Sequence, residues 1–137
     1  MAEINGEEFL ALAKRLPFFK KFSDDELKEI LQYKNHIISY SKGKTIVRQK
    51  DIDLSLFVLI RGNVALTKNE KPNVKIVTMP QGSVFGEVSF LNPTPRITNA
   101  VADNEVTVLK LDGEIFERLS PIVQGKIKDK VIEMLVT

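Results

Sequence analysis

Near the start of the chain, apolar residues recur every three or four positions, which is the spacing of one helix face. The apolar positions of this first stretch are Phe9, Leu10, Leu12, Ala13 and Leu16. Pro17 is expected to end the helix, because proline cannot donate to the helix ladder. A second helix is predicted from Ser23, since Glu26 three residues later completes a capping-box pattern. Residues 1–35 are therefore expected to be helical.

Between residues 36 and 111 the pattern changes to short runs rich in β-branched and aromatic residues, separated by turn residues. The candidate strands read HIISY, KTIVRQ, SLFVLI, NVALT, NVKIVTM, TNAVA and EVTVLKL. The residues between these runs include Gly43, Gly62, Pro72 and Asn104, which favour turns. Many short strands at regular spacing predict a mainly β fold, either a double-sheet roll or a barrel.

Helical patterning returns over residues 112–137. Asp112 is placed to cap one helix, and Ser120 followed by Pro121 is typical of the start of another. The apolar stripe of this last helix consists of Val123, Ile127, Val131, Met134 and Leu135. With 137 residues in all, the chain is predicted to form one domain.

Composition excludes several classes of function. The formal net charge is +2, with basic and acidic residues interleaved, so no block of charge favours nucleic acid as a partner. The chain has no cysteine and His36 is its single histidine, so a histidine-rich metal centre of the cupin type is not expected. We expect no metal, no catalytic residue and no enzymatic activity.

The N-terminal sequence does not resemble a targeting segment. Acidic residues precede its apolar positions, and it lacks the basic start and apolar core of a signal peptide. No uninterrupted apolar run approaches the length of about 18 residues that would span a membrane. A cytoplasmic location is the expectation that follows.

One stretch, FGEVSFLNPTPR, combines features of an anion site. Gly86 follows the strand-like Val84 and Phe85, at a point where the backbone must turn. A helical turn from Glu87 would present unpaired N–H groups at its start, which favour a phosphate. Arg96 could hold two phosphate oxygens, and Glu87 could accept a hydrogen bond from a sugar hydroxyl. The alternative is a surface ion pair between Glu87 and Arg96, worth about 0–1 kcal/mol.

The segment QGSVFGEVSFLNPTPRITNAVA resembles the phosphate-binding cassette of the cyclic nucleotide-binding domain family. Catabolite activator proteins, protein kinase regulatory subunits and nucleotide-gated channels belong to this family. Two further segments, LPFFKKFSDDELKEI and FVLIRGNVALT, are similar to its first helices and one of its hairpins. The resemblance implies a jelly roll (double-stranded β-helix) with N-terminal helices, a cassette at 82–98 and a C-terminal lid helix.

By resemblance, the ligand-binding residues are expected in the cassette and on the strands and helix around it. They are Phe85, Gly86, Glu87, Val88, Ser89, Arg96, Ile97 and Thr98, with Leu66, Ile76, Met134 and Leu135 as candidate contacts to the base. Where the family commonly has Ala, Ser or Thr after the arginine, this chain has Ile97, so cyclic AMP is favoured over cyclic GMP. Side-chain alternation would turn Thr98 away from the site. Lys50 replaces a glycine that is usual in the family, and a changed turn is expected there.

The chain ends at Thr137, soon after the predicted lid helix, so no DNA-reading module is expected. We therefore expect a stand-alone sensor that signals through its C-terminal helix to a separate effector protein or by forming a homodimer. Two alternatives stay open: a scaffold that keeps the fold without binding nucleotide, and a site for another phosphorylated small molecule.

Overall fold

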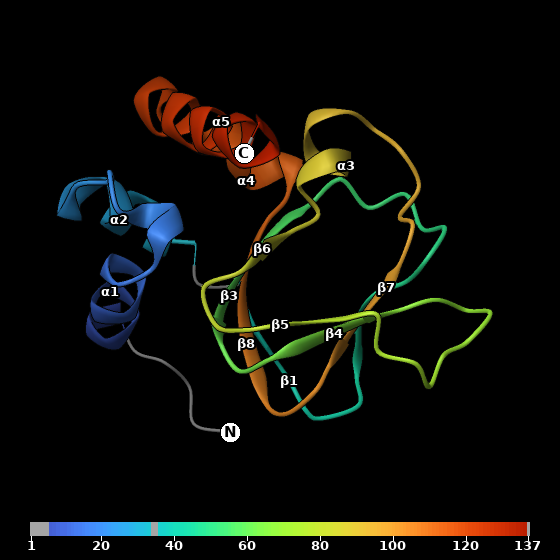
Figure 1. Ribbon diagram of the computed structural model, residues 1–137. Helices are drawn as coiled ribbons and strands as arrows, with labels where there is room; N and C mark the ends of the chain where they lie inside the picture. The colour runs from blue at the N-terminus through green and yellow to red at the C-terminus, as the bar shows by residue number, and fades with distance from the viewer. Residues whose placement is uncertain (1–5, 34–35, 137) are drawn as a thin grey trace.

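The computed structural model describes residues 6–33 and 36–136, and its elements are labelled in Figure 1. The helices are α1 (Gly6–Lys14), the short 3-10 helix η1 (Pro17–Phe19), α2 (Asp24–Leu31), α3 (Glu87–Leu91), α4 (Gly113–Arg118) and α5 (Pro121–Val136). The strands are β1 (Ile37–Tyr40), β2 (Thr45–Val47), β3 (Leu56–Arg61), β4 (Val64–Thr67), β5 (Val77–Met79), β6 (Val84–Phe85), β7 (Asn99–Ala102) and β8 (Val106–Leu111).

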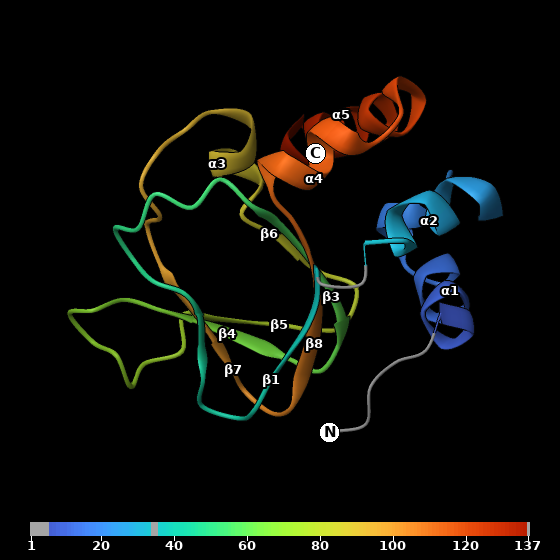
Figure 2. The ribbon, with the colours of Figure 1, turned by 180° about the vertical axis from the view of Figure 1, so that it is seen from behind.

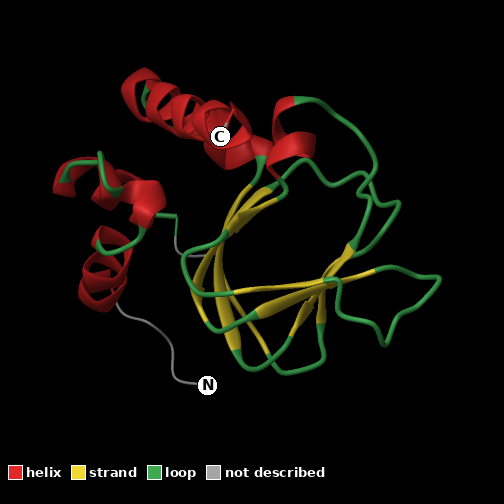
Figure 3. Ribbon diagram, in the orientation of Figure 1, coloured by secondary structure: helices red, strands yellow, loops and turns green. Residues whose placement is uncertain are grey.

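The strands form two antiparallel four-stranded sheets, ordered β1-β8-β3-β6 and β2-β7-β4-β5. Strands distant in sequence pair within each sheet, as where Leu56 of β3 lies opposite Leu111 of β8. Figure 3 shows the sheets curving around one another, with α1 and α2 beside the roll and α3 over one end of it. The prediction of a mainly β roll with flanking helices is confirmed.

Sheet β1-β8-β3-β6 is buried on both faces. One face, which includes Leu56, Val58 and Ile60, packs under the helices. The other face, which includes Phe57 and Leu59, packs against the second sheet. This double burial explains why SLFVLI is a continuous apolar run rather than an alternating one.

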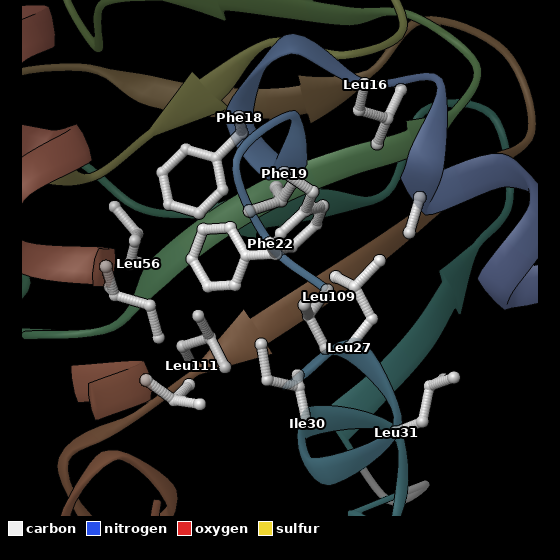
Figure 4. Packing of buried hydrophobic residues seen from close by; sticks show 14 of the residues in the cluster. Leu16, Phe18, Phe19, Phe22, Leu27, Ile30, Leu31, Leu56, Leu109 and Leu111 are labelled. Atoms are coloured by element: carbon white, nitrogen blue, oxygen red, sulfur yellow. The ribbon is translucent and has the colours of Figure 1, made fainter. Parts of the chain in front are cut away.

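The N-terminal helices are anchored by a cluster of three phenylalanines between α1 and α2 (Figure 4). The ring of Phe19 meets the rings of Phe18 and Phe22 edge to face, with centroids 5.0 and 5.4 Å away. All three side chains are buried together with Leu109 and Leu111 of β8. The helices are therefore packed on the outer face of the roll.

The predicted helix caps are present. Ser23 Oγ accepts a hydrogen bond from the backbone N–H of Glu26 at 3.2 Å, and Glu26 Oε1 accepts one from the N–H of Ser23 at 2.7 Å. Asp112 likewise caps α4, because its Oδ1 accepts from the N–H of Ile115 at 2.9 Å. These local patterns are read correctly from sequence because both partners lie within one helical turn.

Helix α5 is held against the N-terminal helices. Lys126 Nζ lies 2.6 Å from Glu26 Oε1, and Ser120 Oγ lies 3.0 Å from Glu29 Oε1. Val123, Ile127 and Val131 are buried in the shared core. Viewed from behind, α5 lies on the same side of the roll as α2 (Figure 2). Among the described helices, none has the length and apolar character needed to cross a membrane.

The structure shortens one predicted strand. The run NVKIVTM was expected to be extended throughout, but only Val77–Met79 forms β5. Its partner β4 ends at Thr67, and residues 68–74 form consecutive turns, in which the N–H groups of Lys71 and Val74 bond to the carbonyls of Lys68 and Lys71. Ile76 still donates its N–H to the Leu66 carbonyl at 2.8 Å, but the residues before it have no facing strand and no ladder to join.

Lys50 is the one non-glycine among the described residues with a positive φ, at 77°. Left-handed backbone costs a residue with a side chain about 1–2 kcal/mol. The Lys50 N–H nevertheless bonds to the Arg96 carbonyl at 2.7 Å, which fixes this turn beside the predicted cassette. Lys50 therefore has the left-handed backbone that favours glycine, rather than the changed turn that was expected.

Substituting Lys50→Gly is expected to raise the free energy of unfolding by up to about 1 kcal/mol, because glycine removes the left-handed strain while adding some unfolded-state entropy. Urea unfolding followed by circular dichroism measures the change. Lys42→Gly, at an exposed turn position without positive φ, is the control and should not stabilise the protein. If Lys50→Gly and Lys42→Gly lowered the free energy of unfolding equally, the claim that the backbone at Lys50 is strained would be wrong.

Candidate ligand-binding site

A cavity of about 260 Å³ opens at the end of the roll nearest α3. Its wall is the continuation of the core between the two sheets, so much of it is apolar. The lining residues are Val47, Leu66, Met79, Val84, Phe85, Gly86, Glu87, Val88, Ser89, Thr94, Pro95, Arg96, Ile97, Thr98 and Ala100. All eight residues predicted in the cassette therefore border one cavity.

Gly86 makes the turn between β6 and α3 with a φ of +85°. A β-carbon at this position would lie 2.6 Å from Arg96 Nη1 and 2.6 Å from the Ser55 carbonyl oxygen. Real β-carbons essentially never approach other atoms so closely. Glycine is thus required both by the backbone conformation and by the guanidinium packed beneath it.

Arg96 is buried, with 7% of its surface exposed, and it borders the cavity. Its Nη2 donates to the Ser55 carbonyl at 2.7 Å, whereas its buried Nε has no hydrogen-bond partner among the described residues. Burial lowers the pKa of the guanidinium, opposed by the negative charges of Asp53 and Glu87. Arginine remains protonated even so, which leaves a buried cation with unused donor capacity.

Asp53 is a partner of Arg96 that the sequence analysis missed. Its Oδ1 lies 3.8 Å from Arg96 Nη2 and accepts the N–H of Ser55 at 2.9 Å, and its Oδ2 lies 4.0 Å from Lys110 Nζ. Burial raises the pKa of Asp53, but hydrogen bonds from Ser55 and the charges of Lys110 and Arg96 outweigh it, so the net pKa is lowered. The carboxylate is therefore ionised beside the arginine.

Substituting Asp53→Asn is expected to lower the free energy of unfolding at neutral pH by up to about 1 kcal/mol, because the ion pairs are long and partly exposed. A carboxyl with a lowered folded-state pKa contributes stability that is fully present above its ordinary value of 3.8. That contribution is lost as the pH falls through the lower folded value. The gap between wild type and variant, measured by urea unfolding, should therefore close below pH 3.8. A gap that stayed constant would contradict this role.

Helix α3 lines the cavity beside Arg96. The first N–H that bonds back along the helix is that of Phe90, to the Gly86 carbonyl at 3.0 Å, so the preceding N–H groups lie before the helix ladder begins. The Ser89 hydroxyl donates to the Thr94 carbonyl at 3.0 Å and holds the loop that leads back to Arg96. The Ser89 side chain therefore supports the loop, whereas its backbone N–H is one of those that precede the helix ladder and is expected to be available to a ligand.

Ile97 and Thr98 both border the cavity, contrary to the expectation from strand alternation. The chain bends at these two residues, and β7 begins only at Asn99, so alternation does not apply to them. Ile97 is 77% exposed at the opening, whereas Thr98 is half-buried and brings a hydroxyl to the wall.

The four candidate base contacts are not brought together. Leu66 borders the cavity, but Ile76, Met134 and Leu135 are not among its lining residues. Ile76 lies on an exposed hairpin, and Met134 packs toward the core beneath α5. Leu135 is 46% exposed. Contact of Met134 and Leu135 with a ligand stays a prediction that requires α5 to move, and contact of Ile76 stays a prediction that does not depend on α5.

Asn99 is a second residue that the sequence analysis missed. Its Oδ1 accepts the N–H of Gln49 at 2.7 Å, and its Nδ2 donates to Asn69 Oδ1 at 2.9 Å. Gln49 Oε1 in turn accepts the N–H of Asn69 at 2.7 Å. This amide network ties the start of β7, just after the cassette, to two neighbouring loops.

The fold and the cavity define a class of protein: a β-roll domain whose pocket suits a small anionic ligand. The family model for the cyclic nucleotide-binding domain matches residues 37–120. This is more than half of the chain, and the chain belongs to that family. The predicted family is thereby confirmed.

Similar proteins include a protein kinase, a protein kinase regulatory subunit and one solved domain. The chain is 27% identical over 122 residues to mouse (Mus musculus) cGMP-dependent protein kinase 2, a match covering 85% of this chain and 16% of the kinase. It is 29% identical over 89 residues to a cAMP-dependent protein kinase regulatory subunit of Hypocrea atroviridis, covering 65% and 19%. A cyclic nucleotide-binding domain from Methylobacillus flagellatus has a TM-score of 0.75 at 19% identity, covering 95% and 75%. The chain thus spans less than a fifth of these kinase proteins.

Proposed function

We propose that the chain is a regulatory sensor that binds a cyclic nucleotide, cyclic AMP in preference to cyclic GMP, and performs no catalysis. The observation that supports this most strongly is the buried Arg96 guanidinium, which borders the cavity and whose Nε finds no hydrogen-bond partner in the described part of the chain. A cyclic phosphate would supply acceptors for that cation. Glu87, on the same wall, would accept from the ribose, and the apolar wall of Val47, Leu66 and Met79 would hold the base.

The choice between the two nucleotides rests on the residues after Arg96. Ile97 offers no hydroxyl to a guanine, which favours cyclic AMP. Thr98 borders the cavity and is the one residue of this pair that could favour cyclic GMP. The related kinases are named for both nucleotides.

Calorimetric titration with cyclic AMP and cyclic GMP in parallel tests the proposal. Saturable, tighter binding of cyclic AMP is the expected result. If Thr98→Ala selectively weakens cyclic GMP, Thr98 supplies the guanine contact; tighter binding of cyclic GMP by the wild type would reverse the preference. A folded protein that binds neither nucleotide would favour the scaffold alternative.

We propose further that ligand moves α5. The helix lies off the cavity, and its apolar residues Ile132, Leu135 and Val136 are 50%, 46% and 80% exposed. Val88 and Ile97, at the cavity, are likewise exposed, so closure would bury both surfaces. A ligand shifts this equilibrium only by binding the covered state more tightly. The moved helix would act on a separate effector protein or a second copy of the chain.

Hydrogen exchange over residues 121–136 tests this movement. The expected result is altered protection at saturating cyclic AMP, with little change in α1. Unchanged exchange in α5, despite binding measured by calorimetry, would show that the nucleotide is bound without helix movement.

A further inference from the structure

The hairpin between β4 and β5, residues 68–77, projects from the roll in both ribbon views (Figures 1 and 2). Its aliphatic side chains are poorly covered: Val74 is 52% exposed, Ile76 52% and Val77 48%. Isolated exposed apolar residues are ordinary, but three within four positions concentrate exposed aliphatic side chains on one projecting segment. None of the three lines the cavity.

The same hairpin is basic. It carries Lys68, Lys71 and Lys75 against the single acid Glu70. Because the chain has 20 basic and 18 acidic residues, the hairpin holds the whole excess of positive charge and the rest of the chain is balanced. Lys75 pairs with Asp103 at 2.6 Å, whereas no ion pair to Lys68 or Lys71 is found among the described residues. Both of these lysines are exposed.

The hairpin is also held in shape. Its turns are closed by backbone bonds, and the N–H of Ile76 donates to the Leu66 carbonyl at 2.8 Å. At its base, Asn69 bonds to Gln49 and to Asn99 through the amide network described above. The aliphatic and cationic groups are therefore presented together by an ordered backbone.

We propose that the β4–β5 hairpin docks on a membrane surface that contains anionic phospholipid. Aliphatic side chains that enter the interface and lysines that contact anionic headgroups are the two contributions that drive such binding. A stable protein interface draws on about 20–30 residues from each partner, whereas this segment has ten. The docking is independent of nucleotide binding.

Co-sedimentation with lipid vesicles tests the proposal. The wild-type chain is expected to sediment with phosphatidylcholine vesicles that contain phosphatidylserine, and not with phosphatidylcholine alone. Lys68→Gln with Lys71→Gln should lower the partition coefficient about 30-fold at low ionic strength, and less as salt is added. Val74→Ser with Ile76→Ser should lower it at least about tenfold.

Matched variants control for charge and for apolar surface. Lys42→Gln with Lys44→Gln makes the same change of charge at exposed positions outside the hairpin, and Ile122→Ser removes an isoleucine that is 69% exposed on α5. Both should sediment like wild type. Equal sedimentation with neutral vesicles, or equal losses in the controls, would overturn the proposal. So would hairpin-dependent binding of a polyglutamate peptide without vesicle binding, which would indicate an acidic protein partner.

Discussion

Substituting Arg96→Ala is expected to weaken binding of cyclic AMP about 100-fold. The guanidinium is buried and is held in place by the Ser55 carbonyl, and Arg96 borders the cavity; its Nε has no hydrogen-bond partner among the residues that the structure describes. Truncating one member of a buried, hydrogen-bonded charge pair costs about 2–5 kcal/mol, and about 3 kcal/mol corresponds to 100-fold. Calorimetric titration measures the loss, and circular dichroism shows whether the variant is folded.

Two further variants separate the causes of that loss. Arg96→Lys keeps the positive charge but not the planar set of donors, so it should bind more weakly than wild type and more tightly than Arg96→Ala. Arg48→Ala removes an exposed arginine that does not line the cavity, and its affinity should be unchanged. Wild-type affinity in folded Arg96→Ala would show that the phosphate is held elsewhere.

Much of the fold can be predicted from the sequence because it depends on local signals. Ser23 and Glu26 cap α2 from within one turn, and Asp112 caps α4 in the same way. The run SLFVLI marks a strand that is covered on both faces. The strand pairing itself joins residues far apart, such as Leu56 and Leu111, and a local pattern carries no signal for it.

The cassette could be predicted as a unit, but its supports could not. Arg96 and Ser55 are 41 positions apart, so no spacing rule brings them together. The nearest local signal is the hydrogen bond from the Ser55 N–H to Asp53 two residues earlier, a common turn feature that does not identify a partner for arginine. The bend at Ile97 and Thr98 was also missed, because alternation was assumed before β7 begins.

The position of α5 has a consequence for coupling. Its contacts with the N-terminal helices, through Lys126 to Glu26 and Ser120 to Glu29, stabilise the uncovered arrangement. Any ligand that brings α5 over the cavity must offset the loss of those contacts. If nucleotide moves α5 as proposed, its affinity and the position of the helix would be linked in both directions.

Substituting Gly86→Ala is expected to lower the free energy of unfolding by about 2–5 kcal/mol and to abolish measurable nucleotide binding. Left-handed backbone accounts for about 1–2 kcal/mol of this, and the rest comes from forcing a methyl group against the Ser55 carbonyl and Arg96. The methyl group displaces the guanidinium, so stability and affinity fall together. Urea unfolding and calorimetric titration measure the two effects.

Gly43→Ala separates backbone strain from the close approach. Gly43 has a φ of +88°, almost equal to that of Gly86, but a β-carbon there would meet nothing within 4 Å. Its substitution should cost only the strain, about 1–2 kcal/mol, and leave the affinity for cyclic AMP unchanged. The difference between the two variants therefore measures how closely the backbone of β6 and α3 packs on Arg96. If Gly86→Ala and Gly43→Ala lowered the free energy of unfolding equally and both variants still bound cyclic AMP, the Arg96 guanidinium would be able to shift without cost.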